Sequence, residues 1–168
     1  MELELVKKKL LYGIILVMAI SSRFLLNFRE GIFFQILSFF LLFSLFSALI
    51  YWLKQYREYM PEKKLTLGKV VYFSFQLFVI AAVFSSIVKY FFFMYVKPLE
   101  FQMIMNQTVD FMLKEAKYPP QMVKESVSFF TPANFAIMSG LINVFAGVLM
   151  SCIVWPLLKR EQESTSYK

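Results

Sequence analysis

The sequence has no histidine and only one cysteine in 168 residues. A chain without histidine cannot build a histidine-based metal centre, and a single cysteine forms neither a zinc knuckle nor an internal disulfide. Cys152 also lacks a histidine that would activate it as a nucleophile. Glycine is scarce, at five residues, and no glycine-rich phosphate loop is present. We therefore expect no metal, no cofactor and no enzymatic activity.

Charge is also scarce, because only 17% of the residues are charged while 59% are hydrophobic. Ordinary soluble domains are roughly 45–50% apolar, so this composition is not that of a soluble protein. The 21 Phe and 9 Tyr residues exclude a disordered chain. The length fits one domain, which we place over residues 1–168.

Four apolar runs are long enough to cross a bilayer, which takes about 20 helical residues. They lie near residues 10–28, 32–53, 70–96 and 133–158. The second and fourth runs carry no charge, the first holds only Arg23, and the third holds only Lys89. The sequence therefore predicts an all-α integral membrane protein, a bundle of four transmembrane helices.

Acidic residues are absent from all four runs. Proton-coupled transporters and intramembrane aspartyl or metal proteases need carboxylates or histidines within the membrane. This absence is a second argument against those functions.

The basic residues between the runs predict the orientation of the chain, because short cytoplasmic loops concentrate Lys and Arg. Eleven of the 18 fall on one side: Lys7, Lys8, Lys9, Lys54, Arg57, Lys63, Lys64, Lys69, Lys159, Arg160 and Lys168. We therefore expect both termini in the cytoplasm. The net charge of +7 then reflects topology and headgroup attraction. Nucleic acid is not an expected partner, because the basic residues are divided among three separate segments.

Residues 97–131 form the one sizeable segment outside the runs, on the predicted outer side. Apolar residues recur there at helical spacing from Phe101 to Ala116, which indicates an amphipathic helix. Pro119-Pro120 ends it, a second short helix follows, and Thr131-Pro132 begins the last span. This helical hairpin is either a docking element for a partner or lipid surface, or a lid packed on its own bundle.

The two cations within the runs are candidate ligand-binding residues, because charge in hydrocarbon is costly. Lys89 lies about 30 Å from the inner end of its span and can snorkel to the outer headgroups. Arg23 lies only about 21 Å along its helix. Full snorkelling is harder from that depth, so the alternatives for Arg23 are snorkelling, a pairing with Glu30 or Glu100, or an anionic ligand. If Arg23 and Lys89 face each other, they form a lipid-phosphate or anion site.

A stripe of small and polar residues runs along one face of the fourth span. Its members are Ala136, Gly140, Asn143, Gly147 and Ser151. Small residues let helices approach closely, and an asparagine in lipid needs a hydrogen-bond partner. Candidate partners on the second and third spans are Ser44, Ser47, Ser74 and Gln76. The stripe serves packing within the chain, dimerisation with a second copy, or pore lining.

The segment Tyr95-Val96-Lys97-Pro98, the helix after it, Thr131-Pro132 and the last span ending in Lys159-Arg160 resemble a known family. It is the small four-helix membrane proteins of Bacteroidota catalogued as domain of unknown function 4199. Its members usually continue from that proline directly into an acidic residue, whereas here Leu99 precedes Glu100. The resemblance implies a multi-pass protein of a bacterial inner membrane, and it implies no activity or site residues.

These patterns together predict a non-catalytic accessory or scaffold subunit that acts through helix packing and the outer hairpin. The alternative is a small transporter, channel or lipid-handling protein in which Arg23, Lys89 and Asn143 line a site for an anion or headgroup. The expected partners are the lipid bilayer and either another membrane protein or a second copy of the chain.

Overall fold

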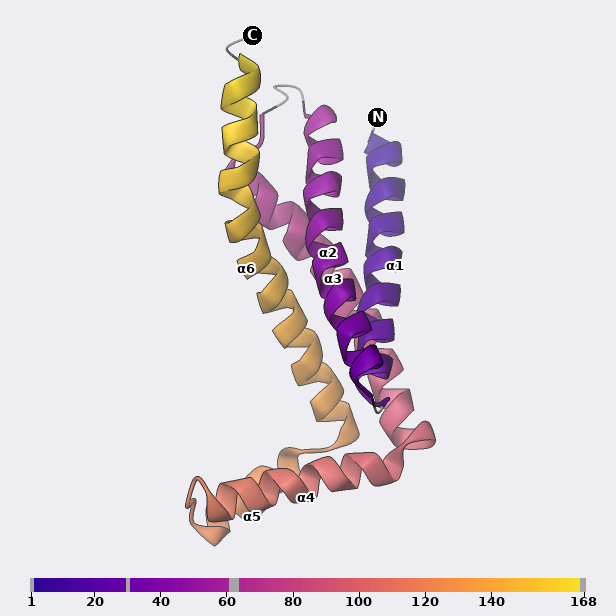
Figure 1. Ribbon diagram of the computed structural model, residues 1–168, viewed down its shortest axis with the longest axis vertical. Helices are drawn as coiled ribbons and strands as arrows, with labels where there is room; N and C mark the ends of the chain where they lie inside the picture. The colour runs from indigo at the N-terminus through magenta and orange to yellow at the C-terminus, as the bar shows by residue number, and fades with distance from the viewer. Residues whose placement is uncertain (1, 30, 61–63, 167–168) are drawn as a thin grey trace. The chain divides into compact units, whose positions relative to one another are not determined.

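The computed structural model of the protein describes residues 2–29, 31–60 and 64–166, with side chains for residues 4–29, 31–60 and 64–161. Within these ranges it contains six α-helices, one π-helix and no strand (Figure 1). The elements are α1 (Glu2–Leu26), α2 (Ile32–Glu58), α3 (Leu67–Phe91), η1 (Phe92–Val96), α4 (Pro98–Lys114), α5 (Pro120–Phe129) and α6 (Pro132–Ser166).

Four helical stretches are long and apolar enough to span a membrane. They are Glu4–Leu26, Ile32–Glu58, Leu67–Val96 and Pro132–Glu161. The prediction of an all-helical chain with four candidate spans is confirmed. The helices extend beyond the expected apolar runs at their charged ends, since α1 begins at Glu2 and α6 continues to Ser166. Lys, Glu and Gln are strong helix formers, so the helix continues where the hydrophobic sequence stops.

The chain divides into two compact units. Unit 1, residues 1–85 and 140–168, contains α1, α2 and most of α3 and α6. Unit 2, residues 86–139, contains the end of α3, then η1, α4, α5 and the first residues of α6. Each unit has its own packing.

In unit 1, α1 and α2 are antiparallel partners. Tyr12 stacks on Trp52 with ring centroids 4.9 Å apart, and towards the other end of α1 Ser38 donates a hydrogen bond to Asn27 at 2.9 Å. Gly31 begins α2 with a φ of 118°, a conformation that side-chain-bearing residues rarely adopt. The connection between the helices is therefore short, as the sequence predicts.

By contrast, α1 and α3 run parallel. Lys9 Nζ donates to Gln76 Oε1 at 2.9 Å, and four residues further along both helices Gly13 faces Ile80. A methyl group built on Gly13 would lie 3.0 Å from Ile80 Cγ2. This direction is expected, because the antiparallel helix α2 returns the chain to the end of the unit at which α1 began, and α3 begins there.

A close helix contact in unit 1 joins α3 to α6 at Gly147. A methyl group built on Gly147 would lie 2.2, 2.3 and 2.6 Å from three atoms of the Phe78 ring. The buried Phe78 ring therefore lies directly against the backbone of α6. In a membrane such van der Waals contact is a main source of helix association, because burial away from lipid contributes little.

Unit 2 is organised around three aromatic rings from three elements. Phe93 of η1 lies 5.3 Å from Phe101 of α4 and 5.2 Å from Phe135 of α6, measured between ring centroids. The π-helix ends where the Lys97 N–H bonds the Phe92 carbonyl, five residues earlier, at 2.8 Å. Pro98 then begins α4, a position where the missing N–H costs nothing.

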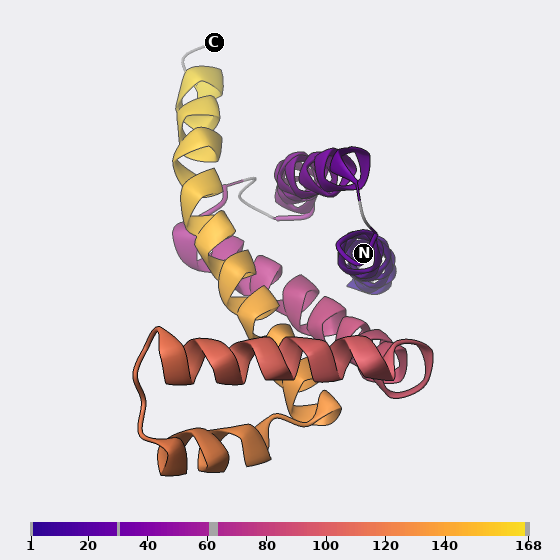
Figure 2. The same ribbon diagram turned by 60° about the horizontal axis from the view of Figure 1, so that its bottom comes forward.

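The predicted amphipathic segment forms α4, and the prolines separate it from α5. Figure 2 shows α4 and α5 side by side. Each helix has one buried side chain, Phe101 on α4 and Val123 on α5. The turn between them contains Lys117 at a φ of 51°. Their position on the outer side of a membrane stays a prediction.

Replacing Gly147 by alanine tests the contact with Phe78. We expect Gly147→Ala to destabilise the protein by about 1–3 kcal/mol, as overpacking of a tight interior usually does. Thermal unfolding in a mild detergent measures the effect. Gly68→Ala is the control, since nothing lies within 4 Å of a methyl group there. A Gly147→Ala protein as stable as the control would contradict the contact, whereas Phe78→Leu should partly restore the Gly147→Ala variant.

Candidate functional site

Several polar atoms in the helices of unit 1 are buried and have no hydrogen-bond partner within the described part of the chain. They are Ser21 Oγ, Arg23 Nε, Ser74 Oγ and Asn143 Nδ2. In hydrocarbon, where no water can substitute, each unsatisfied group costs several kcal/mol. At these positions unit 1 could form a further hydrogen bond with a ligand or another molecule.

Arg23 is half-buried in the last turn of α1. One expected partner, Glu30, lies outside the described residues. The other, Glu100, is ion-paired with Lys97 three residues before it in unit 2. Arg23 therefore remains a candidate ligand-binding residue, and its Nε has no hydrogen-bond partner among the described residues.

The small-residue stripe of α6 faces the interior. Ala136 and Ser151 are buried, as are Gly140 and Gly147, while Asn143 is half-buried. Ser151 donates to the carbonyl of Gly147 at 2.7 Å. Whether the stripe serves packing within the chain, dimerisation or pore lining stays a prediction.

The side chains that were expected to form a hydrogen bond with Asn143 do not accept one from its Nδ2 in the described part of the chain. Gln76 accepts its bond from Lys9, and Ser44 donates to the carbonyl of Leu41 at 3.0 Å. Ser47 is exposed, and Ser74 Oγ is buried with no partner in the described ranges. Periodicity predicted which face is polar, but it did not identify the facing residues.

Lys89 is buried in unit 2, with 4% of its surface exposed. Its ammonium donates to Ser139 Oγ on α6, and one turn earlier Ser86 Oγ donates to the Ala136 carbonyl at 2.8 Å. The side chain thus fastens α3 to α6 within unit 2, where the sequence suggested that it would extend to the headgroups. Whether Lys89 and Arg23 form one site stays a prediction.

Sequence reasoning missed a cluster of lysines and aromatic rings at the N-terminal end of α1. Lys9 Nζ, bonded to Gln76, lies 5.5 Å from the centroid of the Tyr56 ring and 5.8 Å from that of Phe73. Lys8 Nζ lies 4.9 Å from the centroid of the Tyr59 ring. Cations are attracted to the faces of aromatic rings at these distances.

This lysine–aromatic cluster surrounds a shallow surface depression that encloses no space for a water molecule. Its lining residues are Leu5, Lys8, Lys9, Tyr12, Gln55, Tyr56, Tyr59 and Phe73. The signal available in the sequence was the spacing of Trp52, Tyr56 and Tyr59, which places three aromatic residues on one face of α2. Nothing in the sequence indicated that this face meets the lysines of α1.

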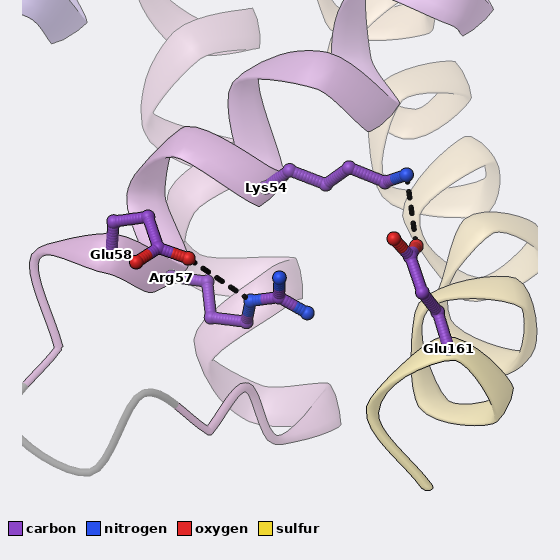
Figure 3. Close-up of polar contacts among 4 residues, drawn as sticks. All are labelled: Lys54, Arg57, Glu58 and Glu161. Carbon is purple, nitrogen blue, oxygen red and sulfur yellow. Dashed lines mark ion pairs between the residues drawn. The ribbon is translucent and has the colours of Figure 1, made fainter. Parts of the chain in front are cut away.

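Ion pairs lie at the C-terminal ends of α2 and α6. Lys54 of α2 lies 2.9 Å from Glu161 of α6, and Arg57 lies 3.7 Å from Glu58 (Figure 3). The Lys54 and Glu161 side chains are about two-fifths exposed, so the pair is worth about 0–1 kcal/mol. These pairs leave two basic side chains at this end of unit 1 partly neutralised.

The chemistry available in the described ranges is that of cations, amides and hydroxyls. No group of three or more Cys, Asp or Glu side chains there is arranged to hold a metal ion, and Cys152 is exposed. Ammonium, guanidinium and amide groups bind anions, carboxylates and phosphates. The arrangement therefore suits binding and packing.

A family model described as Protein of unknown function (DUF4199) matches residues 10–160. The match includes most of the four candidate spans and the α4–α5 segment between the last two. Neither a curated protein nor a solved structure matches the chain. The family description assigns no activity, so the functional argument depends on the geometry.

Proposed function

The chain belongs to the DUF4199 family of proteins of unknown function, and we propose that it is a non-catalytic membrane subunit that docks a partner membrane protein. Its four apolar helices are those of a multi-pass membrane protein. The proposal rests on the exposed apolar surface of α4 and α5, which lie outside the candidate spans. Leu99 and Phe129 are 71% exposed there, Phe111 is 61% exposed and Met103 is 60% exposed. Exposed apolar side chains outside the spans are typical of an interaction surface.

The charge of this α4–α5 hairpin favours a protein partner over the lipid surface. Interfacial helices that lie on a membrane are usually rich in Lys and Arg on the polar face. Between residues 97 and 131 the basic and acidic residues are equal in number, and they comprise Lys97, Lys114, Lys117, Lys124, Glu100, Asp110, Glu115 and Glu125. A hairpin without net charge has little attraction to anionic headgroups, so its apolar side chains are better matched by a protein surface.

We further propose that both termini face the cytoplasm of a bacterium, with the hairpin outside the inner membrane. The distribution of Lys and Arg supports this orientation, since the two ends of the chain and residues 54–69 carry eleven of the 18 basic residues. The parallel course of α1 and α3 in unit 1 is consistent with it.

Replacing exposed apolar side chains of the hairpin tests the docking proposal. The tagged protein is purified from its native membrane in a mild detergent, and mass spectrometry quantifies the proteins that accompany it. We expect Phe111→Ser combined with Phe129→Ser to reduce a stoichiometric partner at least tenfold, because exposed aromatic residues often dominate binding energy. Gln107→Ser, an exposed polar position on α4, is the control and should retain the partner. Equal recovery of partner with both variants, or a homo-oligomer without partner, would contradict the proposal.

A second candidate function is a small transporter, channel or lipid-handling protein with an anion or headgroup site. The unpartnered donors Arg23 Nε and Asn143 Nδ2 favour it, since buried donors are costly unless a ligand bonds them.

Asn143→Leu discriminates between the two functions. In a packing role, removal of a buried unsatisfied donor should raise stability by about 1–3 kcal/mol and leave bound lipid unchanged. In a binding role, Asn143→Leu and Arg23→Gln should each deplete the same co-purified anionic ligand. Thermal unfolding and lipid mass spectrometry on the same samples provide both readouts. The docking proposal predicts the first result, and a shared loss of ligand would favour the second candidate.

A further inference from the structure

The lysine–aromatic cluster at the start of α1 carries more basic than acidic residues, since Lys7, Lys8 and Lys9 outnumber Glu2 and Glu4 in the sequence, and the Glu4 carboxylate acts on Lys8. Among the described residues no carboxylate forms an ion pair with Lys7, Lys8 or Lys9, whereas Lys54 and Arg57 at the same end are paired with acidic side chains. Lys9 is held by an uncharged acceptor, Gln76. Three adjacent ammonium groups that exceed the nearby carboxylates in number attract an anion.

Two of these ammonium groups are also held in place. Lys9 is fixed by its bond to Gln76 and by the rings of Tyr56 and Phe73, which stack 4.4 Å apart between α2 and α3. Lys8 lies over Tyr59, next to the stacked pair of Tyr12 and Trp52. Charges held by packed rings lose less freedom when a ligand binds, which favours affinity.

The face of α1 that continues from Lys8 is apolar. Leu11 and Ile15 follow at helical spacing and are 53% and 43% exposed. An anion with a hydrocarbon tail can thus place its charge at Lys8 and its tail along Leu11 and Ile15. The depression between α1 and α2 is too shallow to enclose a headgroup, so the phosphate lies across its mouth at Lys8.

We propose that this end of unit 1 binds the phosphate of an anionic phospholipid in the adjoining leaflet, with Lys8 in contact and Lys9 as a fixed second charge. The site is independent of the proposed docking function, which depends on the α4–α5 hairpin. A free phosphate would gain the charge but not the apolar face, so the lipid is the better match.

Native mass spectrometry in a neutral detergent measures the binding directly. The full-length protein is titrated with phosphatidylglycerol and with phosphatidylcholine of the same acyl chains. We expect preferential binding of phosphatidylglycerol. Lys8→Gln should weaken that binding about fivefold, from roughly 1 kcal/mol for each basic residue near an anionic surface. Lys8→Arg should stay within about twofold of the wild type, because the charge is retained.

Lys7→Gln is the matched control, because it removes the same charge from the same helix at a residue that does not line the depression. We expect a clearly smaller loss for this control than for Lys8→Gln, because Lys7 lies outside the proposed contact with the phosphate. Tyr59→Leu should weaken binding more than Tyr59→Phe, since Tyr59→Phe keeps the ring face that lies under the Lys8 ammonium. Melting temperatures of all variants show whether a loss of binding reflects a loss of folding.

Three results would overturn the proposal. Equal losses for Lys7→Gln and Lys8→Gln would indicate attraction by net charge without a site. Equal binding of the two lipids would exclude recognition of the anionic headgroup. Displacement of the lipid by millimolar inorganic phosphate would assign the cluster to a free anion.

Discussion

The lack of water in the hydrocarbon core decides where the polar side chains of this chain lie. With no solvent to bond, a buried polar group is costly unless another helix or its own backbone supplies a partner, and most of the buried polar side chains described here have one. Lys9 meets Gln76, Ser86 meets a carbonyl of α6, and Lys89 meets Ser139. Each of these bonds also joins two helices. The cost of leaving a polar group unpaired in hydrocarbon therefore favours association of the helices within each unit.

Steric fit supplies the rest of the cohesion, because lipid is as apolar as the helices that it surrounds. The Phe78 ring against the backbone at Gly147 brings α3 and α6 into contact in unit 1, and three phenylalanines perform a similar task in unit 2. The long apolar side chains that remain exposed on the spans face lipid. We propose that two regions bind other molecules. They are the α4–α5 hairpin, which has no net charge, and the basic end of α1.

The sequence predicted the four spans because bilayer thickness fixes their length and their composition. It predicted the helix α4 for equally local reasons, although α4 ends at Lys114, before Pro119-Pro120. It did not predict the π-helix at Phe92–Val96, the partner of Lys9, or the ring that requires Gly147. These features depend on which faces of different helices meet, and periodicity within one helix carries no information about its neighbours. The cation of Lys89 was recognised as significant, but its burial against Ser139 was not foreseen.

The central claim is that the chain crosses the membrane four times with its termini and the α2–α3 loop on the same, cytoplasmic side. Cysteine labelling in intact cells tests it most directly. In a Cys152→Ser background, Lys64→Cys probes the α2–α3 loop and Gln121→Cys probes α5, both at exposed positions. The account predicts that a membrane-impermeant maleimide labels Gln121→Cys in intact cells and labels Lys64→Cys only after permeabilisation. Labelling of both positions from the same side would contradict it.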